Sequence, residues 1–169
     1  MIIDMKQEDK ELLLKDLCAR LPYGVILNIV NEDSAVAYGT FVGMTKSQKH
    51  SCLIYEDLVC IEGVLTPFRM EEVKPCLRPL SSMTEEEGRE YRMFIDFSYN
   101  DFTSENTQCV CIDKINDYLD WLNSRHFDYR GLLERGLALE APEEMYNINN
   151  NIDKNIRFNE NLKFGLLEG

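Results

Sequence analysis

The chain has 169 residues, of which 44% are hydrophobic, and carries a formal net charge of −12. Such a charge argues against direct nucleic-acid binding and against binding to anionic membranes, since both attract positively charged surfaces. No apolar run approaches the roughly 20 residues of a membrane span, and the N-terminus lacks the pattern of a signal peptide, so we expect a cytoplasmic protein. Its six cysteines are then expected to be reduced, buried thiols.

The first predicted element is an amphipathic helix from Lys6 to Arg20. Leu13 and Leu17 recur on one side of it, and Pro22 ends it. From position 24 the pattern changes to short β segments at 25–30, 35–44, 52–61, 66–70 and 73–77. About five short strands at such close spacing predict a curled antiparallel sheet or a small SH3-like barrel.

Helical spacing follows the stretch from 73 to 83. Ser82 and Glu85 match a Ser-x-x-Glu capping box, which predicts a helix reaching position 94 or 95 and then a loop over 96–108. Asp113 is the expected cap of a second helix to about Arg125. Its expected buried side consists of Ile115, Tyr118, Leu119 and Leu122. Residues 128–136 predict a third, short helix that ends at a glycine.

These elements predict an α+β fold in which a helix precedes the β part and a helical C-terminal half follows it. We expect a single domain over residues 1–146, with its β part at about 22–80 and its helical part at about 81–140. Residues 147–169 differ in composition because asparagines interrupt a sparse set of apolar residues. Asparagine competes with regular backbone structure, so we expect a weakly ordered or late-docking extension.

No sequence motif for a phosphate-binding loop, a dinucleotide site, a zinc protease or a serine hydrolase is present. Cys109, Cys111 and His126 would supply three zinc ligands, but a fourth is not evident. Two buried thiols on one strand are the preferred interpretation of the cysteine pair. The sequence therefore predicts no catalytic residue, no metal and no cofactor.

The densest grouping of polar and aromatic side chains lies between positions 121 and 131. It includes His126, Asp128, Tyr129 and Arg130. In one interpretation they form, with Arg78, the wall of a pocket for an anionic or nucleotide-like ligand, in which Arg130 binds phosphate and Tyr129 stacks on a base. In the other, which we prefer, Asp128 caps a helix, Tyr129 is part of the core, and the two arginines bind neighbouring acids.

Acidic residues are concentrated between positions 84 and 120, where ten acids and three bases contribute −7 to the net charge. A solvated helical face is the ordinary explanation. Docking to a basic protein partner is the functional one. Its candidate contacts are Glu85, Glu86, Glu90, Asp117 and Asp120.

Several stretches form a recognisable signature. They are positions 16–25 (Asp-Leu-Cys-Ala-Arg-Leu-Pro-Tyr-Gly-Val), 77–87 (Leu-Arg-Pro-Leu-Ser-Ser-Met-Thr-Glu-Glu-Glu), 120–123 (Asp-Trp-Leu-Asn), 128–132 (Asp-Tyr-Arg-Gly-Leu) and 136–138 (Gly-Leu-Ala). With them the chain resembles, over about residues 12–146, a family of short proteins from gut bacteria and their phages with no established activity. The resemblance implies a phage or mobile-element setting inside the cell. Members often have a second histidine where this chain has Arg125.

Three functions follow, in order of preference. The first is a non-enzymatic phage or mobile-element accessory protein that binds a host or phage protein through its acidic helical face. The second is a small-molecule binder, such as a sponge for nucleotide immune signals that serves counter-defence. The third is a small hydrolase. A homo-oligomer is compatible with each of them.

Overall fold

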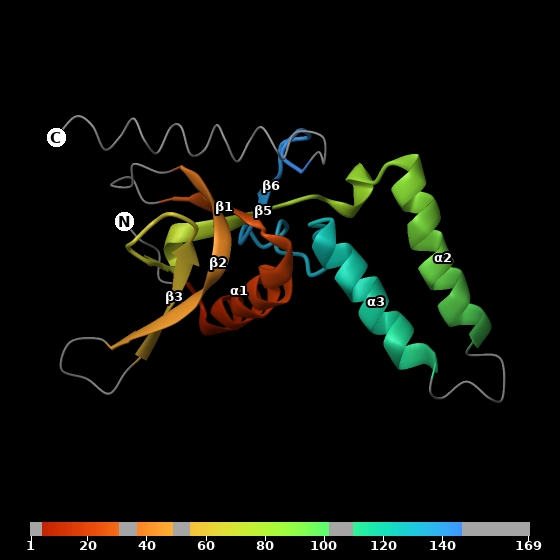
Figure 1. Cartoon of the computed structure of the whole chain (residues 1–169), viewed down its shortest axis with the longest axis horizontal. Coiled ribbons are helices and arrows are strands. Elements are labelled where there is room, and N and C mark those ends of the chain that lie inside the picture. The colour runs from red at the N-terminus through yellow and green to blue at the C-terminus, as the bar shows by residue number, and fades with distance from the viewer. Residues whose placement is uncertain (1–4, 31–36, 49–54, 102–109, 147–169) are drawn as a thin grey trace.

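The computed structural model describes residues 5–30, 37–48, 55–101 and 110–146, with the backbone alone at 48, 55, 56, 95–101 and 110–113 (Figure 1). The helices are α1 (Gln7–Arg20), α2 (Glu85–Asp101) and α3 (Val110–Ser124), with short 3-10 helices η1 (Leu21–Tyr23), η2 (Met70–Glu72) and η3 (Leu80–Ser82). The strands are β1 (Ile26–Ile29), β2 (Tyr38–Gln48), β3 (Tyr55–Ile61), β4 (Phe68–Arg69), β5 (Val73–Leu77) and β6 (Leu139–Glu140).

The strands form one sheet in the order β4-β3-β2-β1-β5-β6. Neighbours are antiparallel except β5 and β6, which run parallel, and the register of β2 against β3 shifts between Phe41 and Gly43. The α+β class is therefore confirmed. Neither the SH3-like barrel nor the purely antiparallel curled sheet of about five strands is what the described residues form, because the sheet is mixed, has six strands and leaves β4 and β6 at opposite edges.

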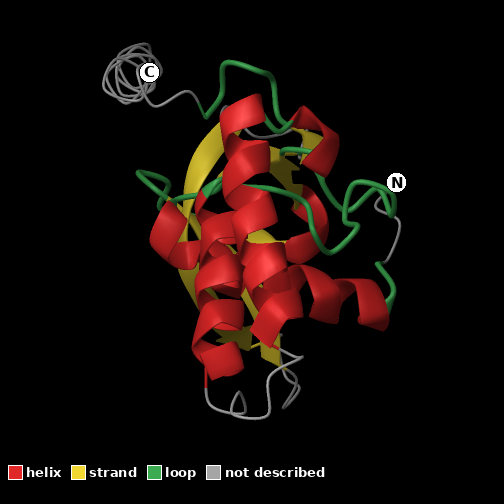
Figure 2. Ribbon diagram, turned by 90° about the vertical axis from the view of Figure 1, so that its right-hand side faces the viewer, coloured by secondary structure: helices red, strands yellow, loops and turns green. Residues whose placement is uncertain are grey.

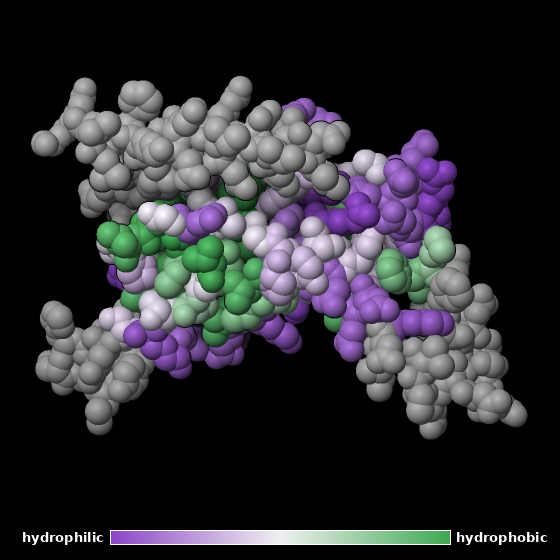
Figure 3. Space-filling view, viewed as in Figure 1, coloured by the Kyte–Doolittle hydropathy of each residue, from purple (hydrophilic) through white to green (hydrophobic). Residues whose placement is uncertain are grey.

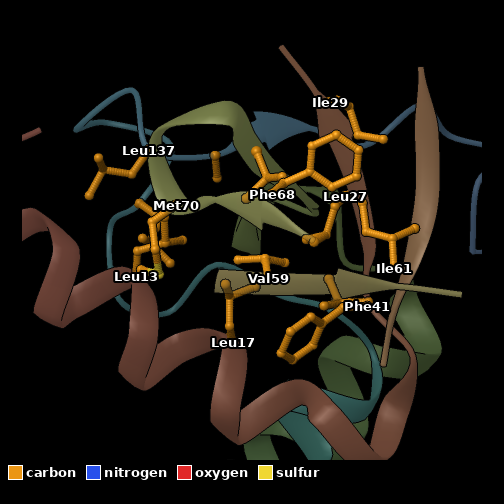
Figure 4. Close-up of a cluster of buried hydrophobic side chains, with 14 of the residues drawn as sticks. Leu13, Leu17, Leu27, Ile29, Phe41, Val59, Ile61, Phe68, Met70 and Leu137 are labelled. Atoms are coloured by element: carbon orange, nitrogen blue, oxygen red, sulfur yellow. The ribbon is translucent and has the colours of Figure 1, made fainter. Parts of the chain in front are cut away.

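The hydrophobic core lies between α1 and one face of the sheet (Figure 4). Leu13 and Leu17 of α1 are fully buried, as is Leu27 of β1. Successive residues of a strand point to opposite faces, and β1 accordingly alternates between half-buried and buried residues. Leu132 and Leu137, from the chain that precedes β6, complete the cluster. The predicted first helix, with Leu13 and Leu17 on its inner side, is confirmed.

The second helix starts at a different cap from the predicted one. The N–H of Glu87 donates to Oγ1 of Thr84 at 3.2 Å, and the N–H of Thr84 donates to Oε2 of Glu87 at 2.9 Å. This reciprocal pair is a capping box, two residues later than predicted. Ser82 instead lies in η3, where its hydroxyl donates to the carbonyl oxygen of Pro79 at 2.8 Å. Because α2 reaches Asp101, the predicted loop is wrong for 96–101 and lies outside the described residues for 102–108.

Helices α2 and α3 form a hairpin that reaches away from the sheet (Figure 1), and from the side it stands in front of the strands (Figure 2). Helix α3 begins at Val110, so the predicted cap Asp113 lies inside it. Leu122 is buried as expected, whereas Ile115, two turns earlier, is 48% exposed. The expected burial of Ile115 is therefore wrong.

Residues 128–136 form turns instead of the predicted short helix. The carboxylate of Asp128 accepts hydrogen bonds from the N–H groups of Leu132, at 3.0 Å, and Leu133, at 2.8 Å. Gly131 and Gly136 both have left-handed φ angles, of 74° and 69°. Gly131 interrupts the segment, because consecutive helical residues need negative φ, whereas a left-handed Gly136 at its end is also what a capping glycine would show.

The cysteines with described side chains are unpaired thiols: Cys76 is buried, Cys60 is half-buried, and Cys18 is exposed, contrary to the expected burial. Burial raises the pKa of Cys76 to about 11, so this thiol stays protonated and inert at neutral pH. Within the described ranges, no helix is long and apolar enough to cross a membrane.

Candidate functional site

The backbone after β5 pairs with the backbone after α3. Arg78 and Phe127 form an isolated parallel bridge, in which the N–H of Arg78 donates to the carbonyl oxygen of His126 at 2.8 Å. The N–H of Asp128 donates in turn to the carbonyl oxygen of Arg78 at 2.8 Å. We call Arg78 together with residues 126–130 the joint. It contains all five residues that the sequence suggested for a ligand pocket.

The side chain of Arg78 binds a carboxylate of α2. Its Nη1 and Nη2 donate to Oε1 and Oε2 of Glu87, each at 2.8 Å, and Nη2 also donates to the carbonyl oxygen of Ser82 at 3.2 Å. The guanidinium lies over the ring of Phe127, with Cζ 4.3 Å from the ring centroid. Two parallel N–H···O bonds form the strongest common arginine–carboxylate geometry. Arg78 therefore joins the sheet to the hairpin, as the structural interpretation predicted.

Glu87 holds together the base of the hairpin, where α2 begins and α3 ends. Besides Arg78, it receives Nη1 of Arg125 at 3.3 Å, and its side chain is only 8% exposed. Burial by itself raises the pKa of Glu87. The hydrogen bonds from Arg78 and from the N–H of Thr84, with the charges of Arg78 and Arg125, outweigh burial and lower the pKa to about 2. Sequence reasoning missed Glu87, although Thr84-x-x-Glu87 matches a capping box as well as Ser82-x-x-Glu85 does.

Glu90, a predicted partner contact, is bound within the chain. Its Oε2 accepts from Nη2 of Arg125 and from Nε1 of Trp121, both at 2.8 Å. The guanidinium of Arg125 also lies 5.1 Å from the centroid of the Trp121 ring. Together with Glu87, these contacts hold α2 against α3 at the base of the hairpin.

Arg130 reaches α1 instead of meeting Arg78. Its Nε lies 3.3 Å from Oδ1 of Asp16, a fully buried carboxylate that also binds Nε of Arg20 at 2.7 Å. Nη2 of the fully buried Arg20 donates to the carbonyl oxygen of Phe127 at 2.8 Å. Asp16 and Arg20 were missed in the sequence, where their spacing of four residues on the buried side of a helix is the available signal.

Tyr129 is held by its neighbours on both sides of its hydroxyl. The O–H donates to Oδ1 of Asn123 at 3.0 Å and accepts from Nη2 of Arg130 at 2.8 Å. Cζ of Arg130 lies 4.8 Å from its ring centroid, and Cζ of Arg20 lies 5.7 Å from it. The phenol thus links α3 with Arg130 and with the buried Arg20.

His126 is buried, with a left-handed φ of 59°. Burial lowers its pKa to about 3, and the positive charges of Arg20 and Arg78 contribute to the lowering. Its ring stacks on Tyr146 with the centroids 3.9 Å apart. Among the described residues, three buried nitrogens have no hydrogen-bond partner: Nδ1 of His126, Nη1 of Arg20 and Nε of Arg130.

The side chain of Tyr146 bridges two central strands, in place of a direct backbone hydrogen bond between them. Its hydroxyl donates to the carbonyl oxygen of Cys76 in β5 at 2.7 Å and accepts from the N–H of Ile26 in β1 at 3.0 Å. Burial raises the pKa of Tyr146, so the hydroxyl keeps its proton and the bridge persists at physiological pH.

The structure thus gathers the five suggested ligand residues in one joint, but Arg78 and Arg130 bind two different carboxylates and do not converge. A ligand at the joint stays a prediction. No three His, Cys, Asp or Glu side chains group to hold a metal ion in the described part of the chain. Of the cysteine pair, Cys109 lies outside the described residues, and Cys111, of which only the backbone is described, lies in α3, so the predicted strand is wrong at that position.

The remaining acids suggested as partner contacts lie at the surface, and one of them also makes a contact within the chain. Glu85, Glu86, Asp117 and Asp120 are all exposed. Burial raises the pKa of Tyr23, and the charge of Asp120 and a hydrogen bond to it raise that pKa further. Asp120 therefore also ties α3 to η1.

No protein-family model, curated protein or solved structure matches the chain.

Proposed function

We propose that this is a non-enzymatic accessory protein of a phage or mobile element that binds a basic protein partner through the exposed side of the α2–α3 hairpin. One observation carries the proposal: the acids of the hairpin divide into two sets. Glu87 and Glu90 bind arginines within the chain, whereas Glu86 and Asp117 point their charge to solvent. The hairpin therefore keeps an outward negative charge that its own arginines do not neutralise.

The charge of the protein and the rigidity of the hairpin favour binding by this surface. The net charge of −12 steers a basic partner toward the protein and speeds the encounter. The ion pairs at the base of the hairpin fix α2 against α3, so less conformational freedom is lost on binding. The hairpin side of the molecule is also predominantly hydrophilic, whereas apolar residues gather over the side of the sheet (Figure 3).

The test compares two variants that carry the same change in charge. Glu86→Lys combined with Asp117→Lys reverses two exposed acids of the hairpin. The control, Glu62→Lys combined with Glu134→Lys, reverses two exposed acids elsewhere. We expect a partner captured by wild type from producing cells to be retained by the control and reduced at least about tenfold by the hairpin variant. Equal capture by both variants would contradict the proposal.

A nucleotide-like small molecule is the second candidate ligand of the protein, and the joint supports it. Two buried nitrogens, Nδ1 of His126 in the joint and Nη1 of Arg20 in the adjoining α1, lack hydrogen-bond partners among the described residues, and Cζ of Arg20 lies 5.7 Å from the centroid of the Tyr129 ring. Thermal unfolding with a panel of linear and cyclic nucleotides tests this candidate, because a ligand that binds only the folded state raises Tm. A panel that leaves Tm unchanged removes it.

A further inference from the structure

We infer that one side of α2, which we call the α2 stripe and which consists of Glu86, Glu90 and Met93, is the docking surface, and that its partner is a basic amphipathic helix. This inference rests on the proposed function. The three residues recur at spacings of four and three, which places them on one side of a helix. Met93 is 59% exposed, although large apolar side chains on a helix usually face a core.

The aromatic contacts establish which side of α2 this is. Tyr91 and Phe94 point toward α3, with ring centroids 5.8 Å from Tyr118 and 6.0 Å from Trp121. The α2 stripe lies beside this inner side. Glu90 connects it to α3 through the hydrogen bond from Trp121. Asp117 precedes Trp121 by one turn, so its carboxylate extends the same surface on the second helix.

The side chains of the α2 stripe indicate which kind of partner it binds. Met93 offers a flexible, polarisable side chain that adapts to apolar groups of different shape. Glu86 and Asp117 provide negative charge around it, so the partner needs lysine or arginine beside an apolar residue. Glu86 and Met93 are seven positions apart, which is about 10 Å along the helix axis. A helix that repeats its apolar and basic residues every two turns matches this spacing.

The chain also supplies matched controls. Glu85 is an exposed acid in the same first turn as Glu86, but it points about 100° away around the helix, off the α2 stripe. Ile115, at 48%, is about as exposed as Met93, but it lies on the side of α3 that carries the buried Leu122. General loss of charge or of apolar surface would affect both members of each pair alike.

The experiment uses two labelled synthetic helical peptides with the same leucine pattern, one with lysine and one with glutamate at the polar positions. Fluorescence anisotropy measures their binding to the full chain. We expect only the lysine peptide to bind, with weaker binding at higher salt. Glu86→Lys and Met93→Ser should each weaken binding about tenfold, whereas Glu85→Lys and Ile115→Ser should change it less than about twofold.

Two results overturn the inference. Equal effects of Glu85→Lys and Glu86→Lys would show that only net charge matters, and failure of the lysine peptide to bind would exclude a basic amphipathic helix as the partner. In both cases the proposed function stands if cellular capture still depends on Glu86 and Asp117. If capture does not depend on them, the proposed function fails whatever the peptides do.

Discussion

Replacing Glu87 with glutamine should destabilise the protein by about 2–3 kcal/mol at neutral pH. Glutamine preserves the shape of the side chain but removes the charge that Arg78 and Arg125 share. Their side chains are only 20% and 32% exposed, so water compensates them incompletely. The variant therefore leaves two partly buried cations without the carboxylate between them.

The magnitude follows from the pKa. Burial raises the pKa of Glu87, but the hydrogen bonds and charges around it lower that pKa to about 2. Compared with an ordinary value near 4.3, this corresponds to about 3 kcal/mol in favour of the ionised carboxylate. Partial exposure of both arginines screens some of the interaction, so about 2 kcal/mol is the lower end of the expected range.

The same carboxylate makes stability depend on pH in an acidic window. Between about pH 4.3 and pH 2, Glu87 is protonated in the unfolded chain and ionised in the folded one. The unfolded state therefore binds more protons, and stability falls as the pH falls. The stabilisation is complete above about pH 5 and disappears as the pH passes through about 2. The difference between wild type and the Glu87→Gln variant should shrink accordingly.

Urea unfolding followed by circular dichroism, at about pH 7 and about pH 3, measures both effects. Glu86→Gln is the control, because Glu86 is the exposed neighbour of Glu87 in the same helical turn and its loss should cost less than about 0.5 kcal/mol. The reasoning is refuted if Glu87→Gln is as stable as this control at neutral pH, or if its deficit is the same at both pH values.

Two further substitutions and one titration test other parts of the fold. Gly39→Ala should cost about 1–3 kcal/mol in chemical denaturation, because the new methyl group would overlap Cγ2 of Ile61; a stable variant would contradict the packing. Tyr146→Phe leaves the N–H of Ile26 without its acceptor and should cost about 1–3 kcal/mol, with faster exchange of that amide; unchanged exchange would exclude the bridge. The imidazole of His126 should stay neutral in NMR titrations down to about pH 4, because burial lowers its pKa to about 3, whereas the unfolded chain protonates near 6.5. Stability should therefore fall as the pH drops below about 6.5, and a titration midpoint above about 6 would contradict this.

The elements that sequence predicted well depend on local patterns. Leu13 and Leu17 repeat at helical spacing over a long segment, and the first helix accordingly lies where its pattern places it. Boundaries failed where two local signals competed. Ser82 and Thr84 each precede an acid by three residues, and only the structure shows that Thr84 caps the helix because η3 already engages Ser82.

The sequence did not predict which residues from distant segments contact each other. The chain has thirty acidic residues, and nothing local marks Glu87 as the one that meets both Arg78 and Arg125. Strand β6 is only two residues long. It forms because it pairs with β5, which lies some sixty positions earlier in the chain. The preferred interpretation of the sequence did have Arg78 bind a neighbouring acid, and it does, but which acid depends on how the hairpin returns to the sheet.

The bridge made by Tyr146 affects how the chain completes its fold during synthesis. The N–H of Ile26 finds its acceptor 120 residues later in the chain. While the ribosome makes the residues between them, the gap between β1 and β5 lacks its phenol, and His126 lacks the ring on which it stacks. Contacts at such separation slow folding, because a long loop must close first. The Tyr146 bridge between the central strands can therefore form only after nearly all of the described chain has left the ribosome.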